Sequence, residues 1–156
     1  MAKTYSPELA KTVKNYLDMN DWHYSFDEGK GIYKCGVNLK GKVSECKLFI
    51  DIKDKAILNY AVINMRADES SRQKVAEFIT RANYGLTFGN FEMDFEDGEI
   101  RYKMTVDCEN QVPGYDVLDR MVVMPPLMFQ RYGDGLLAVM FGFSEPKEAV
   151  EKSEEK

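Results

Sequence analysis

Apolar and polar residues alternate with a period of two over most of residues 22–62. This alternation is typical of β-strands that bury one face, because successive side chains in a strand point to opposite sides. Turn-forming residues interrupt it near Gly29, Lys40-Gly41 and Asp54. The pattern therefore predicts four consecutive antiparallel strands with one buried face. Their expected inward residues are Trp22, Tyr24 and Phe26, then Tyr33, Cys35, Val37 and Leu39, then Cys46, Leu48, Ile50 and Ile52, and finally Leu58, Tyr60 and Val62.

Helical patterns precede and follow these strands. A first helix is expected from Ser6-Pro7-Glu8 to Asn20, because a serine can cap a helix and a proline suits its first position. A second helix should begin after residues 68–71, which offer capping side chains, and end near Asn83, a residue that tolerates left-handed backbone. Apolar residues at helical spacing between these limits support both predictions.

The C-terminal region is predicted to be helical, with an interruption at Pro125-Pro126 and a charged, frayed tail from Ser144. With a hairpin over residues 91–104, the expected order of elements is α-β-β-β-β-α-β-β-α. The 156 residues contain no internal repeat or linker. We therefore expect one α+β domain over residues 1–150, a mainly antiparallel sheet with helices packed on it, and a charged tail over 151–156.

Composition narrows the classes of function. A formal net charge of −5, with acids and bases interspersed, disfavours a nucleic-acid partner, which requires a basic stripe. The longest apolar run, residues 136–143, is shorter than the ~20 residues that a membrane-spanning helix needs. The N-terminus lacks the apolar region of a signal peptide. We expect a cytoplasmic protein that binds neither nucleic acid nor a membrane.

Five acids between Glu92 and Glu99 raise the question of a metal site. A calcium loop with Gly98 at its sixth position would need oxygen ligands where Met93 and Phe95 stand, so that interpretation fails. A hairpin with a two-residue turn at Asp97-Gly98 is predicted instead. This register pairs Phe95 with Ile100, Met93 with Tyr102 and Phe91 with Met104 on one face, and Asp94 with Arg101 and Glu92 with Lys103 on the other.

Cysteine and histidine suggest no reactive site. The single histidine, His23, cannot form a two-histidine metal site. A two-residue loop at Lys40-Gly41 would pair Cys35 directly with Cys46, close enough for a disulfide, but a cytosol keeps such thiols reduced. We expect these two cysteines and Cys108 to be free thiols.

The glycines do not form a phosphate-binding loop, because residues 85–89 lead from a helix into a strand rather than from a strand into a helix. Gly89 is expected to allow close backbone packing at the start of a strand. No catalytic, metal-binding or cofactor-binding residue is assigned, and no cofactor is expected.

Two groups of apolar residues are candidates for a partner-binding surface. The C-terminal region is rich in methionine, a residue that adapts to varied partners, and its candidates are Met121, Met124 and Met128. The alternative is that this region simply covers the sheet. Phe49, Ala61 and Ile63 are expected on the outer face of the third and fourth strands, where apolar residues would meet a helix, a second subunit or a partner.

Residues 83–94 and 97–102 resemble the YbjN family, described as bacterial sensory transduction regulators. The family pattern has an asparagine that ends the middle helix, here Asn83, and a glycine-x-phenylalanine that opens the hairpin, here residues 89–91. The later part of the family pattern resembles this sequence at Tyr132 and over residues 142–149. The order of elements also resembles the fold of type III secretion chaperones, which have three strands before the second helix rather than four.

The resemblance covers residues 6–150 and implies no catalytic residue. It implies a non-enzymatic protein-binding module, regulatory or chaperone-like, and a homodimer, because secretion chaperones of this fold commonly pair. An alternative function is the binding of a small apolar ligand in a pocket between the sheet and the C-terminal helix.

Overall fold

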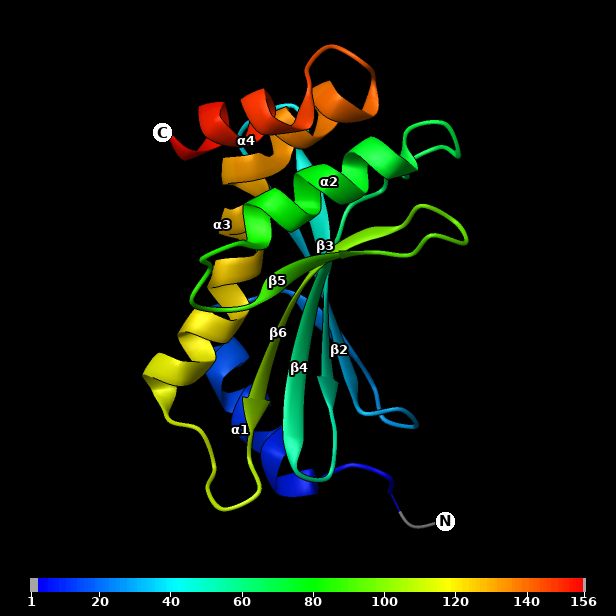
Figure 1. The fold of residues 1–156 in the computed structure, drawn as a ribbon. Coiled ribbons are helices and arrows are strands. Elements are labelled where there is room, and N and C mark those ends of the chain that lie inside the picture. Colours follow the sequence, from blue (N-terminus) through cyan, green and yellow to red (C-terminus); the bar gives the residue numbers. More distant parts are fainter. Residues whose placement is uncertain (1–2, 156) are drawn as a thin grey trace.

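Six strands form a single antiparallel sheet in residues 3–155, the part of the chain that the computed structural model describes. Their order across the sheet is β1-β2-β3-β4-β6-β5, so the β5–β6 hairpin joins a four-stranded meander through β6. Figure 1 shows how the helices of this segment are arranged around one side and one end of the sheet. The strands are β1 (Tyr24–Asp27), β2 (Ile32–Asn38), β3 (Glu45–Ile52), β4 (Ala56–Val62), β5 (Asn90–Met93) and β6 (Ile100–Asp107). The helices are α1 (Pro7–Met19), α2 (Arg72–Asn83), α3 (Tyr115–Met140) and α4 (Pro146–Glu154). The predicted α+β class is confirmed, as is the predicted order of the first nine elements.

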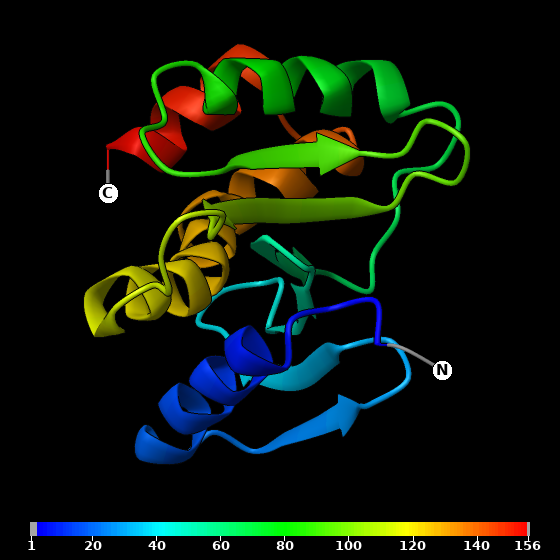
Figure 2. The ribbon, with the colours of Figure 1, turned by 90° about the horizontal axis from the view of Figure 1, so that it is seen from below.

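Helix α1 begins where the sequence predicts. The Ser6 hydroxyl accepts a hydrogen bond from the Leu9 N–H at 3.2 Å, and Pro7 lies in the first turn. The buried hydroxyl of Tyr33 on β2 donates to the Ala10 carbonyl at 2.7 Å. This bond holds α1 against the inner face of the sheet. Figure 2 shows α1 and α3 on the same side of the strands, with α2 running beside β5.

Helix α3 runs without a break through Pro125 and Pro126, so the predicted interruption is wrong. A proline has no N–H, and Pro125 therefore leaves the carbonyl of Met121, four residues earlier, without its usual helical donor. The side-chain amide of Asn59, on β4, donates to that carbonyl with an Nδ2–O distance of 2.8 Å. Asn59 is fully buried. The sheet thus supplies the hydrogen bond that the proline removes from the helix.

The two faces of β4 are the reverse of those predicted. The buried residues that point toward α3 are Ile57, Asn59, Ala61 and Ile63. The residues that point away from it, and are half-buried, are Leu58, Tyr60 and Val62. Both sets are largely apolar, so alternation alone does not decide between them. The hydrogen bond from Asn59 to α3 requires the odd-numbered residues to face the helix.

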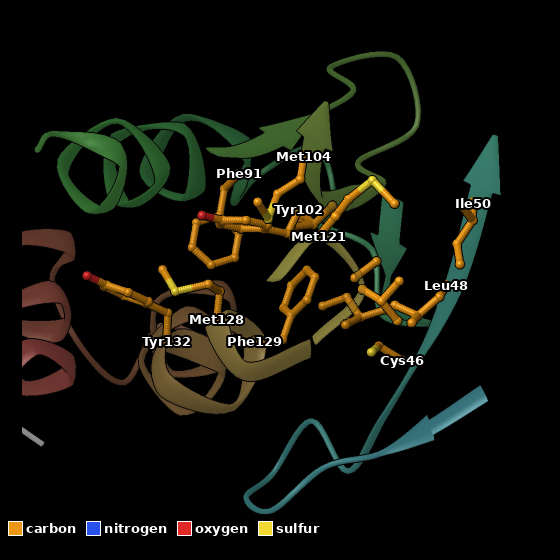
Figure 3. Close-up of a cluster of buried hydrophobic side chains, with 14 of the residues drawn as sticks. Cys46, Leu48, Ile50, Phe91, Tyr102, Met104, Met121, Met128, Phe129 and Tyr132 are labelled. Atoms are coloured by element: carbon orange, nitrogen blue, oxygen red, sulfur yellow. The ribbon is translucent and has the colours of Figure 1, made fainter. Parts of the chain in front are cut away.

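Aromatic and methionine side chains fill the space between the sheet and α3, as Figure 3 shows. The ring centroid of Phe91 lies 4.8 Å from that of Tyr102, 5.3 Å from that of Phe129 and 5.6 Å from that of Tyr132. Met121 is buried beside these rings. Helix α3 therefore covers the sheet, which is one of the two roles considered for the methionine-rich segment.

The segment after Ser144, expected to be frayed, forms helix α4 instead. Ala149, Val150 and Ser153 are buried where α4 packs against α2 and α3. The Tyr132 hydroxyl donates to Glu154 at 3.0 Å, so even the last turn of α4 is fixed to α3. The sequence analysis did not predict α4, because each turn of this helix buries only one or two small residues and the hydrophobic pattern is therefore weak.

Candidate functional site on the open face of the sheet

The face of the sheet opposite α1 and α3 is not covered by a helix in residues 3–155 (Figure 2). We call it the open face, and define it by eight outward-pointing residues of β2, β3, β4 and β6. All eight are exposed or half-buried. The residues are Lys34, Lys47, Phe49, Leu58, Tyr60, Val62, Arg101 and Lys103.

Strand register arranges these side chains in rows that cross the sheet. One row, from β2 to β6, consists of Lys34, Phe49, Tyr60 and Lys103. The next, from β3 to β5, consists of Lys47, Val62, Arg101 and Glu92. Directly opposite residues on adjacent antiparallel strands have Cβ atoms about 5 Å apart, so neighbours in a row contact each other. Each row therefore has an apolar centre with a cation on both sides.

Two interactions hold the cations of β6 in place. The Arg101 guanidinium lies over the Tyr60 ring, 4.3 Å from its centroid. Glu92 on β5 accepts hydrogen bonds from Arg101 at 2.9 Å and from Lys103 at 3.0 Å. Burial by itself raises the pKa of the Glu92 carboxyl, but the bonds from Lys103 and Arg101 outweigh burial and leave this pKa below its usual value. Glu92 is therefore a carboxylate at neutral pH.

A shallow groove of about 340 Å³ crosses the open face, lined by Lys47, Phe49, Tyr60, Val62 and Arg101 among others. A larger hollow of about 550 Å³ lies along α2, but only side chains of that one helix line it. The groove on the open face is built instead from three strands and combines apolar, aromatic and cationic groups. A hollow of about 480 Å³ beside α3 and α4 is larger, but we choose the groove as the candidate binding surface because it combines aromatic and cationic side chains on one sheet face.

The partner-binding residues predicted from sequence do not come together. Phe49 lies on the open face as expected. The placement of Ala61 and Ile63 on that face is wrong, because they are 0% and 3% exposed and point into the core. All three methionines belong to α3, on the other side of the sheet from Phe49; Met121 and Met128 are buried and Met124 is half-buried. The residues that do lie beside Phe49 on the open face are Leu58, Tyr60 and Val62. The sequence analysis missed them because it assigned the two faces of β4 the wrong way round.

The acidic stretch forms a β-hairpin, as predicted, but its register differs by two residues. Phe91 lies opposite Tyr102, and Glu92 opposite Arg101. The connection is longer than two residues because the Asp94 carboxylate accepts the N–H of Glu96 at 2.8 Å and its carbonyl accepts the N–H of Gly98 at 2.7 Å. The predicted burial of Phe95 is therefore wrong, and its side chain is 52% exposed in the loop. Glu92 forms an ion pair with Lys103, but the prediction that the two lie directly opposite each other is wrong, because Lys103 lies opposite Asn90. Arg101 bonds to Glu92 rather than to Asp94.

No three histidine, cysteine, aspartate or glutamate side chains are placed to bind a metal in the part of the chain that the structure describes. Cys35 lies opposite Leu48 rather than Cys46, because the loop between β2 and β3 spans six residues instead of two. Cys35, Cys46 and Cys108 are buried free thiols. Burial raises the pKa of Cys35 to about 11 and that of Cys46 to about 12, so neither is an activated nucleophile.

The asparagine and glycine of the family pattern have structural roles. The Asn83 side chain accepts the N–H of Phe91 at 2.8 Å and donates to its carbonyl at 3.0 Å. These bonds satisfy the backbone of the edge strand β5 on its outer side. A Cβ on Gly89, whose φ is +74°, would lie 2.6 Å from the Lys103 carbonyl oxygen, which confirms the predicted close packing. The Tyr102 hydroxyl donates to the Phe88 carbonyl beside it.

None of the helices in residues 3–155 is both long and apolar enough to cross a membrane.

Comparison with known proteins agrees with this architecture. Residues 9–138 match the model of the YbjN family, described as "Putative bacterial sensory transduction regulator". The crystal structure of YbjN from E. coli matches with a TM-score of 0.58 and 13% sequence identity, over 85% of this chain and 92% of that one. At this identity the match shows a shared fold. No curated protein matches the chain. Because the family match extends over more than half of its residues, the chain belongs to the YbjN family.

Proposed function

We propose that this protein is a non-enzymatic regulatory module that binds a protein partner through the open face of its sheet. One observation carries the proposal: Phe49, Tyr60 and Val62 form an apolar strip on a sheet face without a helix over it. Apolar strips of this kind, bordered by polar groups, are typical of protein interaction sites. The family description, a regulator, supports the same class of function.

Two further features support this proposal over the alternatives. Side chains occupy the space between the sheet and α3, where an apolar ligand was considered (Figure 3). The charged side chains among the eight open-face residues are engaged in ion pairs or exposed, and Glu92 is held ionised by two cations rather than kept protonated as an acid catalyst. We also propose that the protein acts in the cytoplasm, an environment that keeps its three buried thiols reduced.

The test is affinity capture from the native host with matched variants. The open-face variant is Phe49→Glu/Tyr60→Glu. The control is Tyr84→Glu/Phe143→Glu, which replaces two aromatic residues that are 91% and 85% exposed outside the open face. We expect at least one protein to bind the wild type and the control but not the open-face variant. Circular dichroism and cooperative unfolding must show that both variants fold. Identical sets of captured proteins from all three would contradict the proposal.

Self-association remains a separate prediction, which rests on the resemblance to secretion chaperones that pair. Sedimentation equilibrium at micromolar concentration measures it. A species of two chains, present with and without the Phe49→Glu substitution, is the expected result. A wild-type mass of one chain would show that the protein does not form a homodimer.

A further inference from the structure

The open face differs in charge from the rest of the molecule. The whole chain has a formal net charge of −5. The two central rows contain four cations, Lys34, Lys47, Arg101 and Lys103, and a single carboxylate, Glu92. Their net charge is +3. A positive patch on an acidic protein attracts acidic partners, because complementary potentials favour the encounter and fix its orientation.

The four cations of this patch can form more ion pairs with carboxylates than they form within residues 3–155. Glu92 is the partner of both Arg101 and Lys103, so one carboxylate balances two positive charges. Lys34 and Lys47 are exposed and make no ion pair within residues 3–155. A partner that brings carboxylates to the edges of the groove would therefore neutralise charge rather than displace existing bonds.

The apolar strip lies between the cations. Phe49 and Tyr60 separate Lys34 from Lys103, while Val62 separates Lys47 from Arg101. A complementary ligand must therefore present apolar side chains in the middle and carboxylates on both sides. We infer that the open face binds an acidic protein segment, with its apolar residues on Phe49, Tyr60 and Val62 and its acidic residues beside the four cations. This inference rests on the proposed function and adds the chemistry of the partner.

Two other occupants fit the face less well. Single-stranded nucleic acid binds to sheets by stacking bases on exposed aromatic rings, but the Arg101 guanidinium already covers the Tyr60 ring. A second copy related by a two-fold axis would place the same patch against itself. Two patches of net charge +3 would then repel each other. Both occupants are nevertheless distinguishable in the experiment.

The test begins with peptide selection. Random peptides on a display library are selected on the immobilised wild-type protein and depleted on Phe49→Glu/Tyr60→Glu. We expect the remaining peptides to combine apolar residues with a net negative charge. Recovery of neutral or basic peptides, or of no peptide that depends on the open face, would overturn the inference.

Charge reversal then tests the cations directly. The selected peptides are titrated by fluorescence anisotropy against Lys34→Glu/Lys47→Glu and against a control, Lys11→Glu/Lys152→Glu, which changes net charge equally at exposed lysines of α1 and α4. We expect the first variant to weaken binding about tenfold at low salt, and the control to leave it unchanged. Salt should reduce the difference because it screens exposed charges. Equal losses in both variants would refute a role for this patch.

The remaining outcomes separate the inference from the proposed function. Binding of a random single-stranded DNA oligonucleotide that requires Phe49 and Tyr60 would overturn the inference in favour of nucleic acid. A homodimer dissociated by the Phe49→Glu substitution would overturn it in favour of a second copy. If affinity capture finds a partner that requires the open face while the selected peptides are not acidic, the proposed function stands and only this inference fails.

Discussion

If the hydrogen bond from Asn59 to α3 replaces the bond that Pro125 removes, substitutions of these two residues should be energetically coupled. A double-mutant cycle measures this coupling energy. In wild type the Asn59 amide donates to the Met121 carbonyl, which Pro125 has deprived of a helical donor. Asn59→Ala leaves this buried carbonyl without a partner, a penalty of about 1–3 kcal/mol. Loss of the Asn59 Oδ1, a buried atom with no hydrogen-bond partner among the described residues, offsets part of that penalty. We expect a net destabilisation of about 1–2 kcal/mol.

The second substitution, Pro125→Ala, restores an N–H that can donate to the Met121 carbonyl. In this background Asn59→Ala no longer leaves the carbonyl unpaired, so it should destabilise the protein less than in wild type. The expected coupling energy in a double-mutant cycle is about 1 kcal/mol, well above the ~0.3–0.5 kcal/mol scatter of independent sites. The coupling energy is the effect of Asn59→Ala in wild type minus its effect in the Pro125→Ala background, so any stability change caused by Pro125→Ala alone cancels.

Urea unfolding followed by circular dichroism measures the four free energies of the cycle. Pro126→Ala is the matched control, because the carbonyl four residues before Pro126 belongs to Val122 and is not the acceptor of the Asn59 amide. Asn59→Ala should therefore have the same effect with Pro126→Ala as in wild type. Equal effects of Asn59→Ala with and without Pro125→Ala would refute the idea that β4 substitutes for the missing helical bond.

Three further predictions concern the edge of the sheet and the thiols. Glu92→Gln should lower the free energy of unfolding at neutral pH by up to about 1 kcal/mol. Because the folded-state pKa of Glu92 is lowered, this contribution is present above about pH 4.3 and disappears as pH falls through the folded pKa. A difference between wild type and Glu92→Gln that does not decrease in urea unfolding as pH is lowered from neutral into the acidic range would be inconsistent with it. Asn83→Ala should destabilise the protein by about 1–3 kcal/mol and make the Phe91 amide exchange rapidly with deuterium, whereas a still-protected amide would show that the bonds from Asn83 are dispensable. Alkylation of the native protein at about pH 8 should be slow because burial raises the pKa of Cys35 and Cys46, and titration after denaturation without reductant should find three free thiols; a single one would disprove this.

The sequence by itself determined nine of the ten elements of residues 3–155, and their order. Capping residues at Ser6 and the period of two in residues 22–62 are local signals, and local signals specify whether a segment is a helix or a strand. The hairpin in the acidic stretch followed from the same kind of argument, because apolar and charged residues alternate on both of its strands. The sequence predicted that Asn83 ends the second helix, but it did not predict the hydrogen bonds between the Asn83 side chain and the Phe91 backbone.

Register was decided by loops that form their own hydrogen bonds. The Asp97-Gly98 pair indicates a turn, yet the Asp94 carboxylate and carbonyl bind the backbone of the loop and shift the pairing by two residues. In the same way, the loop between β2 and β3 is held by α3, where Gln130 and Asp134 accept the N–H groups of Lys40 and Lys42 at 3.0 and 2.8 Å. These acceptors lie about ninety positions away along the chain, so no local pattern contains them.

The candidate site depended on the tertiary structure more than any other feature. Both faces of β4 are largely apolar, and a polar residue such as Asn59 is normally predicted to face water. Asn59 is buried because Pro125, on a distant helix, leaves a carbonyl that needs a donor. With Asn59 bonded to α3 and Ile57 and Ala61 buried beside it, Tyr60 and Val62 point outward, next to Phe49 on the open face. An unpaired backbone group in a core is costly enough to override a local hydrophobic pattern.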